Sequence, residues 1–102
     1  NRVSAYIGQH IYEPIVIESM AKDLNMSRSN LSSQFSKHAD MTLSFYIMKL
    51  KVTEAQHLLQ FTNDSLSDIA DKLSFSSQSH FQNTFKKHIG ITPLQFRTND
   101  FK

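Results

Sequence analysis

Cysteine is absent from this chain of 102 residues, so it forms no disulfide, cysteine-ligated zinc site or iron–sulfur cluster and has no thiol nucleophile. Long apolar runs are also missing, because runs such as residues 15–17 fall far short of the roughly 20 residues that cross a membrane. We therefore expect no membrane partner and no cofactor. A domain of this size without disulfides must be held by its core alone, which the reducing cytoplasm allows.

Glycine and proline are scarce, with two of each, whereas strand-rich folds of this length need many turns. The apolar residues follow helical spacing almost throughout, which predicts an all-α fold of about seven helices. The first helix is expected over residues 3–11, with Pro14 ending that segment. A long helix is predicted from residue 42 to residue 60, with apolar positions on more than one stripe, as in a central strut.

Short polar residues mark the predicted helix starts. Ser27, Thr42 and Ser77 stand where N-caps are expected. Ser65 and Asp68 have the spacing of a capping box, in which each side chain accepts from a free backbone amide of the first turn. The last helix is predicted to begin at Thr92–Pro93, because proline at the first helical position sacrifices no hydrogen bond.

An internal repeat divides the chain into two similar units. At an offset of 49, Met20, Ala21, Leu24, Met26 and Ser27 match Ile69, Ala70, Leu73, Phe75 and Ser76. At an offset of 50, Leu31, Phe35, Lys37, His38, Thr42 and Tyr46 match Phe81, Phe85, Lys87, His88, Thr92 and Phe96. Each unit combines a short helix, a turn and a longer helix, which predicts helix-turn-helix units at 17–38 and 66–88, joined by the 42–60 helix.

Charge follows the repeat. The net charge is only +2, yet residues 25–52 and 74–102 each carry +3, while residues 53–73 carry −3 and residues 1–24 carry −1. Each basic segment contains the longer helix of one unit. This distribution favours a polyanion with two matching sites. The predicted 18-residue strut would be roughly 27 Å long, which suits successive major-groove sites about 34–36 Å apart.

The second unit carries a specific signature: IADKLSF at 69–75, SHF at 79–81, FKKHIGITP at 85–93 and FR at 96–97. The chain thereby resembles the C-terminal DNA-binding domain of the AraC/XylS family of bacterial transcription regulators, over residues 2–98. The resemblance implies two DNA-reading helix-turn-helix units, treated as one region over 1–102. It also implies an N-terminal effector or dimerisation domain, which we expect to be missing because the chain begins at Asn1. Asp40 and Ser74 replace the family's usual glycines, and Lys51 its usual arginine.

The resemblance implies which side chains contact DNA. Its base-reading positions correspond to Ser29, Ser32, Ser33, Gln78, Ser79, His80, Gln82 and Asn83. Phosphate contacts are assigned to Arg28, Lys37, Lys86 and Lys87. Because Gln and Asn pair with adenine in bidentate fashion, we expect the second unit to supply most discrimination and to prefer A·T-containing steps. The first unit would then contact mainly the sugar-phosphate backbone of the DNA.

Alternative interpretations stand beside these assignments. The serines are also compatible with a solvated helix face, and Lys86 and Lys87 would complement a helix C-terminus as well as phosphate. His80 is equally compatible with a DNA contact and with an idle surface imidazole. His38 and His88 fit dipole-stabilised surface positions better than metal ligands. Arg97 either pairs with an acidic group of the second unit or contacts DNA.

The resemblance implies a bacterial, cytoplasmic, nucleoid-associated regulator of transcription that binds double-stranded DNA and, if it is an activator, also contacts RNA polymerase. We do not expect an enzyme, because no nucleophile elbow, metal-ligand pair or glycine-rich phosphate loop organises the Ser, His and Asp residues. The alternative is a helical protein-interaction module that has lost DNA binding. The acidic middle segment and the polar first recognition helix favour that alternative.

Overall fold

The computed structural model describes residues 2–99, which form seven helices and no strand, so the all-α prediction is confirmed. The helices are α1 (Arg2–Gln9), α2 (Ile17–Asp23), α3 (Arg28–Ala39), α4 (Leu43–Phe61), α5 (Leu66–Lys72), α6 (Gln78–Ile89) and α7 (Pro93–Asn99). Asn1, Asp100, Phe101 and Lys102 lie outside the described residues, and two of them enter the charge count of residues 74–102.

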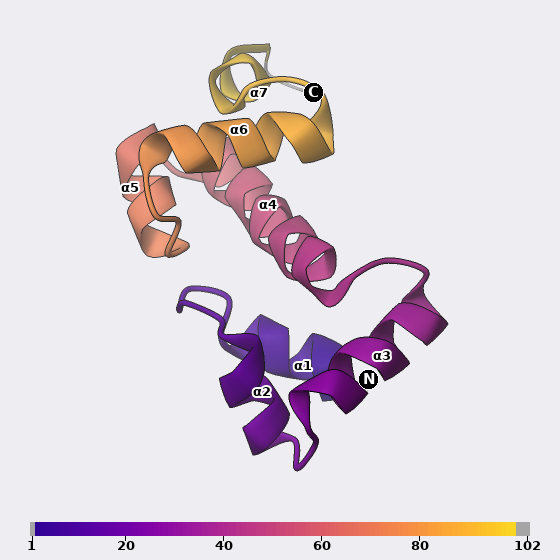
Figure 1. Cartoon of the computed structure of the whole chain (residues 1–102). Coiled ribbons are helices and arrows are strands. Elements are labelled where there is room, and N and C mark those ends of the chain that lie inside the picture. Colours follow the sequence, from indigo (N-terminus) through magenta and orange to yellow (C-terminus); the bar gives the residue numbers. More distant parts are fainter. Residues whose placement is uncertain (1, 100–102) are drawn as a thin grey trace.

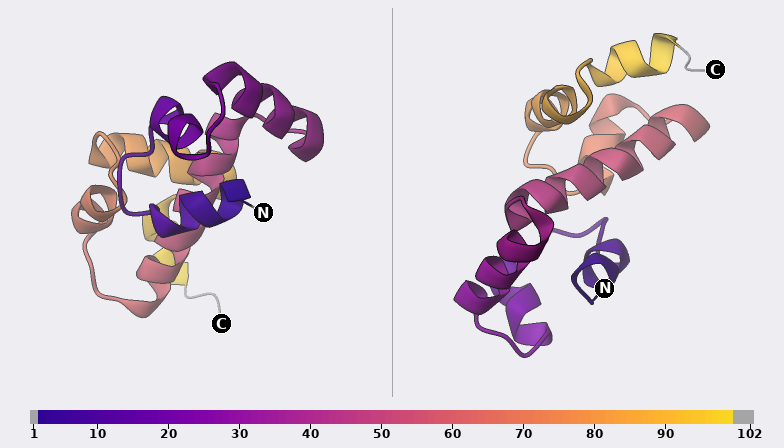
Figure 2. Two further views of the ribbon diagram at one scale, coloured as in Figure 1. Left: turned by 90° about the horizontal axis from the view of Figure 1, so that it is seen from below. Right: turned by 90° about the vertical axis from the view of Figure 1, so that its right-hand side faces the viewer.

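Helix α4 is the central element (Figure 1), 19 residues and roughly 28 Å long. Helices α1–α3 gather toward its N-terminal end, and α5–α7 pack around its remainder, as Figure 2 also shows. The resulting shape is elongated, with principal extents of 42 × 23 × 22 Å. No helix of residues 2–99 is both long and apolar enough to cross a membrane.

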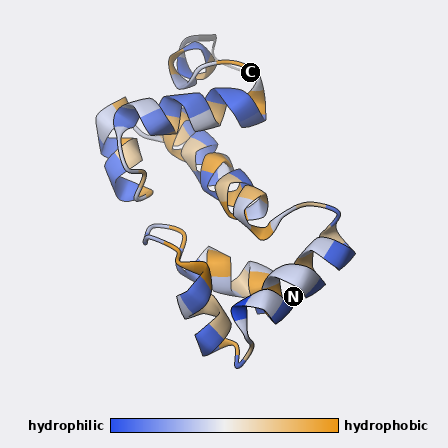
Figure 3. Ribbon diagram, in the orientation of Figure 1, coloured by the Kyte–Doolittle hydropathy of each residue, from blue (hydrophilic) through white to orange (hydrophobic). Residues whose placement is uncertain are grey.

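Two separate apolar cores share α4, which confirms that this helix packs on more than one side. Its first half contributes Leu43 and Ile47 to a core with α1–α3. Its second half contributes Val52, Ala55 and Leu59 to a core with α5 and α6. The mixed hydropathy along α4 in Figure 3 reflects this double role.

Local chemistry sets the helix starts as the sequence predicts. The side-chain oxygens of Ser27, Thr42 and Ser77 accept from backbone amides three residues later, and the capping box of Ser65 with Asp68 is complete. Helix α7 has a similar reciprocal pair between Thr92 and Gln95. The prediction for the first helix was too long, because α1 ends at Gln9 and residues 10–13 form a hydrogen-bonded turn before Pro14.

The helix ends repeat as well. In each helix-turn-helix, a left-handed residue, Asn25 or Ser74, follows the C-cap of the short helix, with φ of 58° or 60°. The next amide reaches back to the carbonyl of Ala21 or Ala70, at 2.8 and 2.9 Å, the hydrogen bond of a Schellman motif. Both alanines are buried, so a larger side chain would have no space there.

Candidate nucleic-acid interface

The first predicted recognition helix is α3, which begins with Ser27 as its cap and buries Leu31 against α1, α2 and α4. Ser29 and Ser33 are exposed and Ser32 is partly exposed. None of the three hydroxyls makes a hydrogen bond to another part of residues 2–99. Their donors and acceptors are therefore available to a ligand.

The second recognition helix is α6, whose buried side is fixed by Phe81 and Phe85, both fully buried. Its other side is polar, as Figure 3 shows along the visible face of α6. It carries the remaining predicted base-reading residues: Gln78, Ser79, His80, Gln82 and Asn83. Gln82 is partly exposed and the other four are exposed.

His80 differs from its neighbours in being held in place. Its Nδ1 lies 3.2 Å from the Ser76 hydroxyl, and its ring packs edge-on against Phe75 with centroids 5.4 Å apart. The imidazole is nevertheless exposed, so Nε2 remains accessible to a ligand. This arrangement orients the ring, and both interpretations of His80 stay open.

Asn30 belongs to the candidate interface but was missed by the sequence prediction. It is exposed and is the third residue of α3, between Ser29 and Leu31. At an offset of 50 it matches His80, so the repeat itself contained the signal. Because Asn pairs with adenine in bidentate fashion, the first unit also carries a side chain that can read bases.

The predicted phosphate-binding cations sit at the ends of the same two helices. Arg28 begins α3, and its guanidinium lies 3.6 Å from the Glu18 carboxylate. Because both side chains are mostly exposed, this ion pair contributes little to the stability of the fold. Lys37, Lys86 and Lys87 are exposed in the last turns of α3 and α6 and have no acidic partner within residues 2–99. These lysines can complement the helix dipole and bind phosphate as well, because the two roles are compatible.

Arg97 does not form the ion pair that was one of its two predicted alternatives, and the DNA contact stays a prediction. Its guanidinium donates to the backbone carbonyls of Leu58, Leu59, Thr62 and Asp64, at 3.4, 3.1, 3.2 and 2.5 Å. These carbonyls lie at and just beyond the C-terminal end of α4; that of Leu58 also accepts from the Thr62 amide, whereas the later ones lie where a helix runs out of backbone donors. Arg97 thus ties α7 to the end of α4 and pairs with no carboxylate.

His88 also differs from the prediction. Its ring packs at a tilt against Phe45 of α4 with centroids 4.6 Å apart, and the side chain is partly buried. Burial lowers the pKa of His88 below its usual 6.5, and the nearby charges of Lys87 and Lys49 lower it further. His88 is therefore partly buried against Phe45 and is not a simple surface residue, and the direction of its pKa shift is opposite to the effect of a helix dipole. No group of three or more metal-ligating side chains occurs among residues 2–99.

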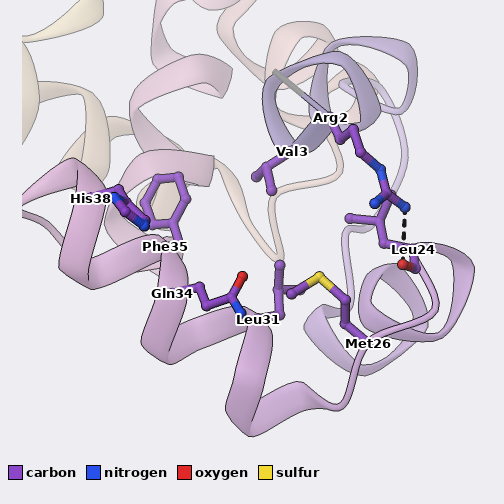
Figure 4. Close-up of a pocket in the computed structure, with 8 residues that line it drawn as sticks. All are labelled: Arg2, Val3, Leu24, Met26, Leu31, Gln34, Phe35 and His38. Carbon is purple, nitrogen blue, oxygen red and sulfur yellow. Dashed lines mark hydrogen bonds between the residues drawn. The ribbon is translucent and has the colours of Figure 1, made fainter.

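The first unit contains an apolar pocket of about 490 Å³ beneath α3 (Figure 4). Its lining comes from α1, the α2–α3 turn and α3: Arg2, Val3, Leu24, Met26, Leu31, Gln34, Phe35 and His38. Arg2 donates to the Leu24 carbonyl at 3.0 Å. None of the predicted DNA-contacting residues lines this pocket, so it is separate from the candidate interface.

Comparison with known proteins agrees with this geometry. A family model described as a helix-turn-helix domain matches residues 20–99. The HTH-type transcriptional activator RhaS of Enterobacter sp. (strain 638) is 29% identical over 97 residues, which cover 95% of this chain and 35% of RhaS. The chain thus spans about a third of the length of the curated relatives it matches.

Solved structures share the fold. An AraC-type transcriptional regulator from Chromobacterium violaceum is 29% identical with a TM-score of 0.92, over 99% of this chain and 90% of that one. The DNA-binding domain of AdpA, a global transcriptional factor solved with a target DNA, has a TM-score of 0.88 at 24% identity. That match covers 95% of this chain and 87% of the AdpA domain, and at this identity it supports the fold alone.

Proposed function

Because this chain belongs to the helix-turn-helix family of AraC-type DNA-binding domains, we propose that it binds double-stranded DNA through α3 and α6. The two helices enter successive major grooves on one face of the duplex. The long dimension of the molecule, 42 Å, accommodates two groove sites that recur about every 34–36 Å. Residues of 17–38 and 66–88 are the two reading units, and α4 joins them.

The observation that carries this proposal is the pair of matched polar surfaces on α3 and α6. Each surface presents exposed or partly exposed polar side chains, and of their hydrogen-bonding groups only His80 Nδ1 has a side-chain partner, Ser76, within residues 2–99. Exposed cations follow on the same helices. Polar readers flanked by cations are what base-edge recognition with phosphate anchoring requires.

The two units share discrimination unequally. Gln78, Gln82 and Asn83 give α6 three amide side chains, whereas α3 offers Asn30 among short hydroxyls, because its other amide, Gln34, lines the pocket. Amides favour adenine in the major groove, so both half-sites should contain A·T pairs, with the stronger preference under α6. Selection from random DNA tests this assignment, and a G-rich consensus under α6 would contradict it.

The matched relatives contain a region of this kind within a longer protein. The matched relatives are transcriptional activators about three times as long as this chain. We assign this chain the same place, within a bacterial, nucleoid-associated transcription regulator whose effector or dimerisation domain lies elsewhere. Contact with RNA polymerase would follow from the position of the bound domain beside a promoter.

Fluorescence anisotropy with a labelled random duplex tests DNA binding directly. Four phosphate contacts, from Arg28, Lys37, Lys86 and Lys87, should weaken binding about 150-fold between 50 and 200 mM salt, since the logarithmic slope is about −0.9 per contact. Weak binding without salt dependence would contradict the proposal. It would favour a partner-binding module in its place.

Matched lysine variants locate the interface. Lys86→Gln and Lys87→Gln should each weaken binding to all duplexes alike and reduce the salt slope by about 1. Lys22→Gln, on the last turn of α2, removes the same charge outside the candidate interface and should leave the slope unchanged. Equal effects of all three variants would indicate a response to net charge alone.

A further inference from the structure

Residues 11–13, in the turn after α1, contact the second unit directly. Lys51 of α4 is 2% exposed, and its Nζ donates to the carbonyls of Ile11 at 2.8 Å, Glu13 at 3.0 Å and Leu73 at 2.6 Å. The Ser74 hydroxyl donates to the carbonyl of Tyr12 at 2.8 Å. We call this arrangement the clasp, defined by residues 11–13, Lys51 and residues 73–74.

The clasp directly links the two groups of helices, α1–α3 and α5–α7, beside α4. Among residues 2–99, extended packing between α1–α3 and α5–α7 runs through α4, on which each group of helices has its own core. Two groups of helices that are joined only through α4 could still rotate relative to each other about its axis. The clasp opposes that motion, because it joins the turn after α1 to the end of α5 at a second place.

The chemistry of Lys51 makes the clasp hard to open. An ammonium group has three donors, and here three backbone carbonyls receive them. If residues 11–13 moved away, a buried cation would lose two of its three acceptors, and such a loss is strongly unfavourable. The hydroxyl of Tyr12 also donates to the Glu54 carboxylate, which adds a further contact between this turn and α4.

The repeat shows which part of this arrangement is particular to the junction. Arg2 precedes Lys51 by 49 residues, and Leu24 precedes Leu73 by the same offset. Arg2 donates to the Leu24 carbonyl at 3.0 Å, as Lys51 does to that of Leu73. A cation at the end of the short helix is therefore common to both units. Only Lys51 also holds a segment of the other unit.

We propose that the clasp fixes the relative orientation of α3 and α6 and so sets the spacing between the two DNA half-sites that the domain accepts. This inference rests on the proposed DNA binding for its consequence, but its geometric part stands without DNA. Lys51 is then a positioning residue: it contacts no DNA and acts through the placement of the two recognition helices.

The geometric part is tested without DNA by pulsed electron spin resonance. The chain lacks cysteine, so spin labels can be placed at Ser36→Cys on α3 and Lys86→Cys on α6, two exposed positions at an offset of 50. The parent protein should give one narrow distance distribution. Lys51→Met should broaden the distribution and shift its maximum, while Lys51→Arg should restore it. Arg2→Met removes the matched cation and should leave it narrow.

Lys51→Met risks loss of folding, so Ser74→Ala provides a milder variant that removes one hydrogen bond at the partly exposed edge of the clasp. It should broaden the distribution less, in the same direction. If Lys51→Met folds and gives the same distance distribution as the parent protein, the clasp does not fix the orientation and the inference is overturned. If Lys51→Met does not fold, the same result with Ser74→Ala overturns the inference.

The functional part uses duplexes built from the selected consensus, with the two half-sites moved apart one base pair at a time. The parent should bind one spacing at least tenfold better than its neighbours, and Lys51→Met should flatten this preference without changing binding to a duplex that holds one half-site. If a variant has a broadened spin-label distance distribution but keeps the parent's preference for one half-site spacing, the proposed link between the clasp and the spacing is overturned. Absence of binding by the parent to any duplex would refute the proposed function, while the spin-label result would still decide the clasp.

Discussion

The matched helix ends at Asp40 and Gly90 allow a quantitative test of the repeat. Asp40 ends α3 and Gly90 ends α6, at an offset of 50, and both have left-handed backbones with φ of 59° and 97°. Each amide bonds to the carbonyl four residues earlier, at 3.1 and 2.8 Å. The sequence thus places a strained aspartate where its own second copy has glycine.

Asp40→Gly should stabilise the domain. Relief of the left-handed strain contributes about 1 kcal/mol, and removal of a carboxylate from the negative end of a helix contributes about 0.5 kcal/mol. The greater freedom of glycine in the unfolded chain offsets about 0.7 kcal/mol. The expected net gain is about 0.8 kcal/mol, or roughly 3–6 °C in melting temperature for a domain of this length.

Two further variants separate the causes. Asp40→Asn keeps a side chain that tolerates the left-handed region and removes only the charge, so it should gain about 0.5 kcal/mol. Gly90→Ala should lose about 1–2 kcal/mol, because no atom lies within 4 Å of the added Cβ and the backbone conformation is the only cost.

Urea unfolding followed by circular dichroism at several salt concentrations measures these changes. The charge component should shrink at high salt, whereas the backbone component should not. If Asp40→Gly destabilised the domain, or if Gly90→Ala had no cost, the left-handed ends would not carry the strain assigned to them, and the argument from the repeat would be refuted.

The remaining predictions concern titration, the end of α4 and base reading. Burial lowers the pKa of Lys51 from 10.5 to about 8, so the unfolded chain binds more protons than the folded chain between these pH values. The free energy of unfolding should therefore rise from pH 7.5 to 9.5, by at most about 1.4 kcal/mol per pH unit. Lys51→Met should show no such rise. The lowered pKa of His88 means that stability should fall as pH drops from 7 to 5, and His88→Gln should reduce that fall in acid unfolding curves. Arg97→Met leaves carbonyls at the end of α4 without their donor and should cost about 2–3 kcal/mol in urea unfolding, a loss that Arg97→Lys should partly recover. Asn30→Ala should weaken binding to the selected site by about 1–3 kcal/mol while leaving the salt slope unchanged; an effect equal on all sequences would assign Asn30 to the backbone.

Local chemistry explains why much of the candidate interface was predictable. The helix starts depend on residues such as Ser27 and Ser77, whose hydroxyls bond to amides only three positions away. The repeat and the family signature then placed the predicted readers on α3 and α6. The repeat matches Asn30 to His80, but the prediction assigned base reading in the first unit to the serines alone.

Tertiary structure decided the residues whose partners are distant in the chain. The sequence marked Lys51 only as an unusual lysine, yet its acceptors at Ile11 and Leu73 lie 40 and 22 residues away. Arg97 likewise reaches carbonyls 33 to 39 residues earlier, and the pKa of His88 depends on burial against Phe45. Periodicity and caps describe each helix from its own neighbours, whereas a buried cation or imidazole is defined by what packs around it. The sequence therefore determined the two reading helices, and only the tertiary structure determined how they are held relative to each other.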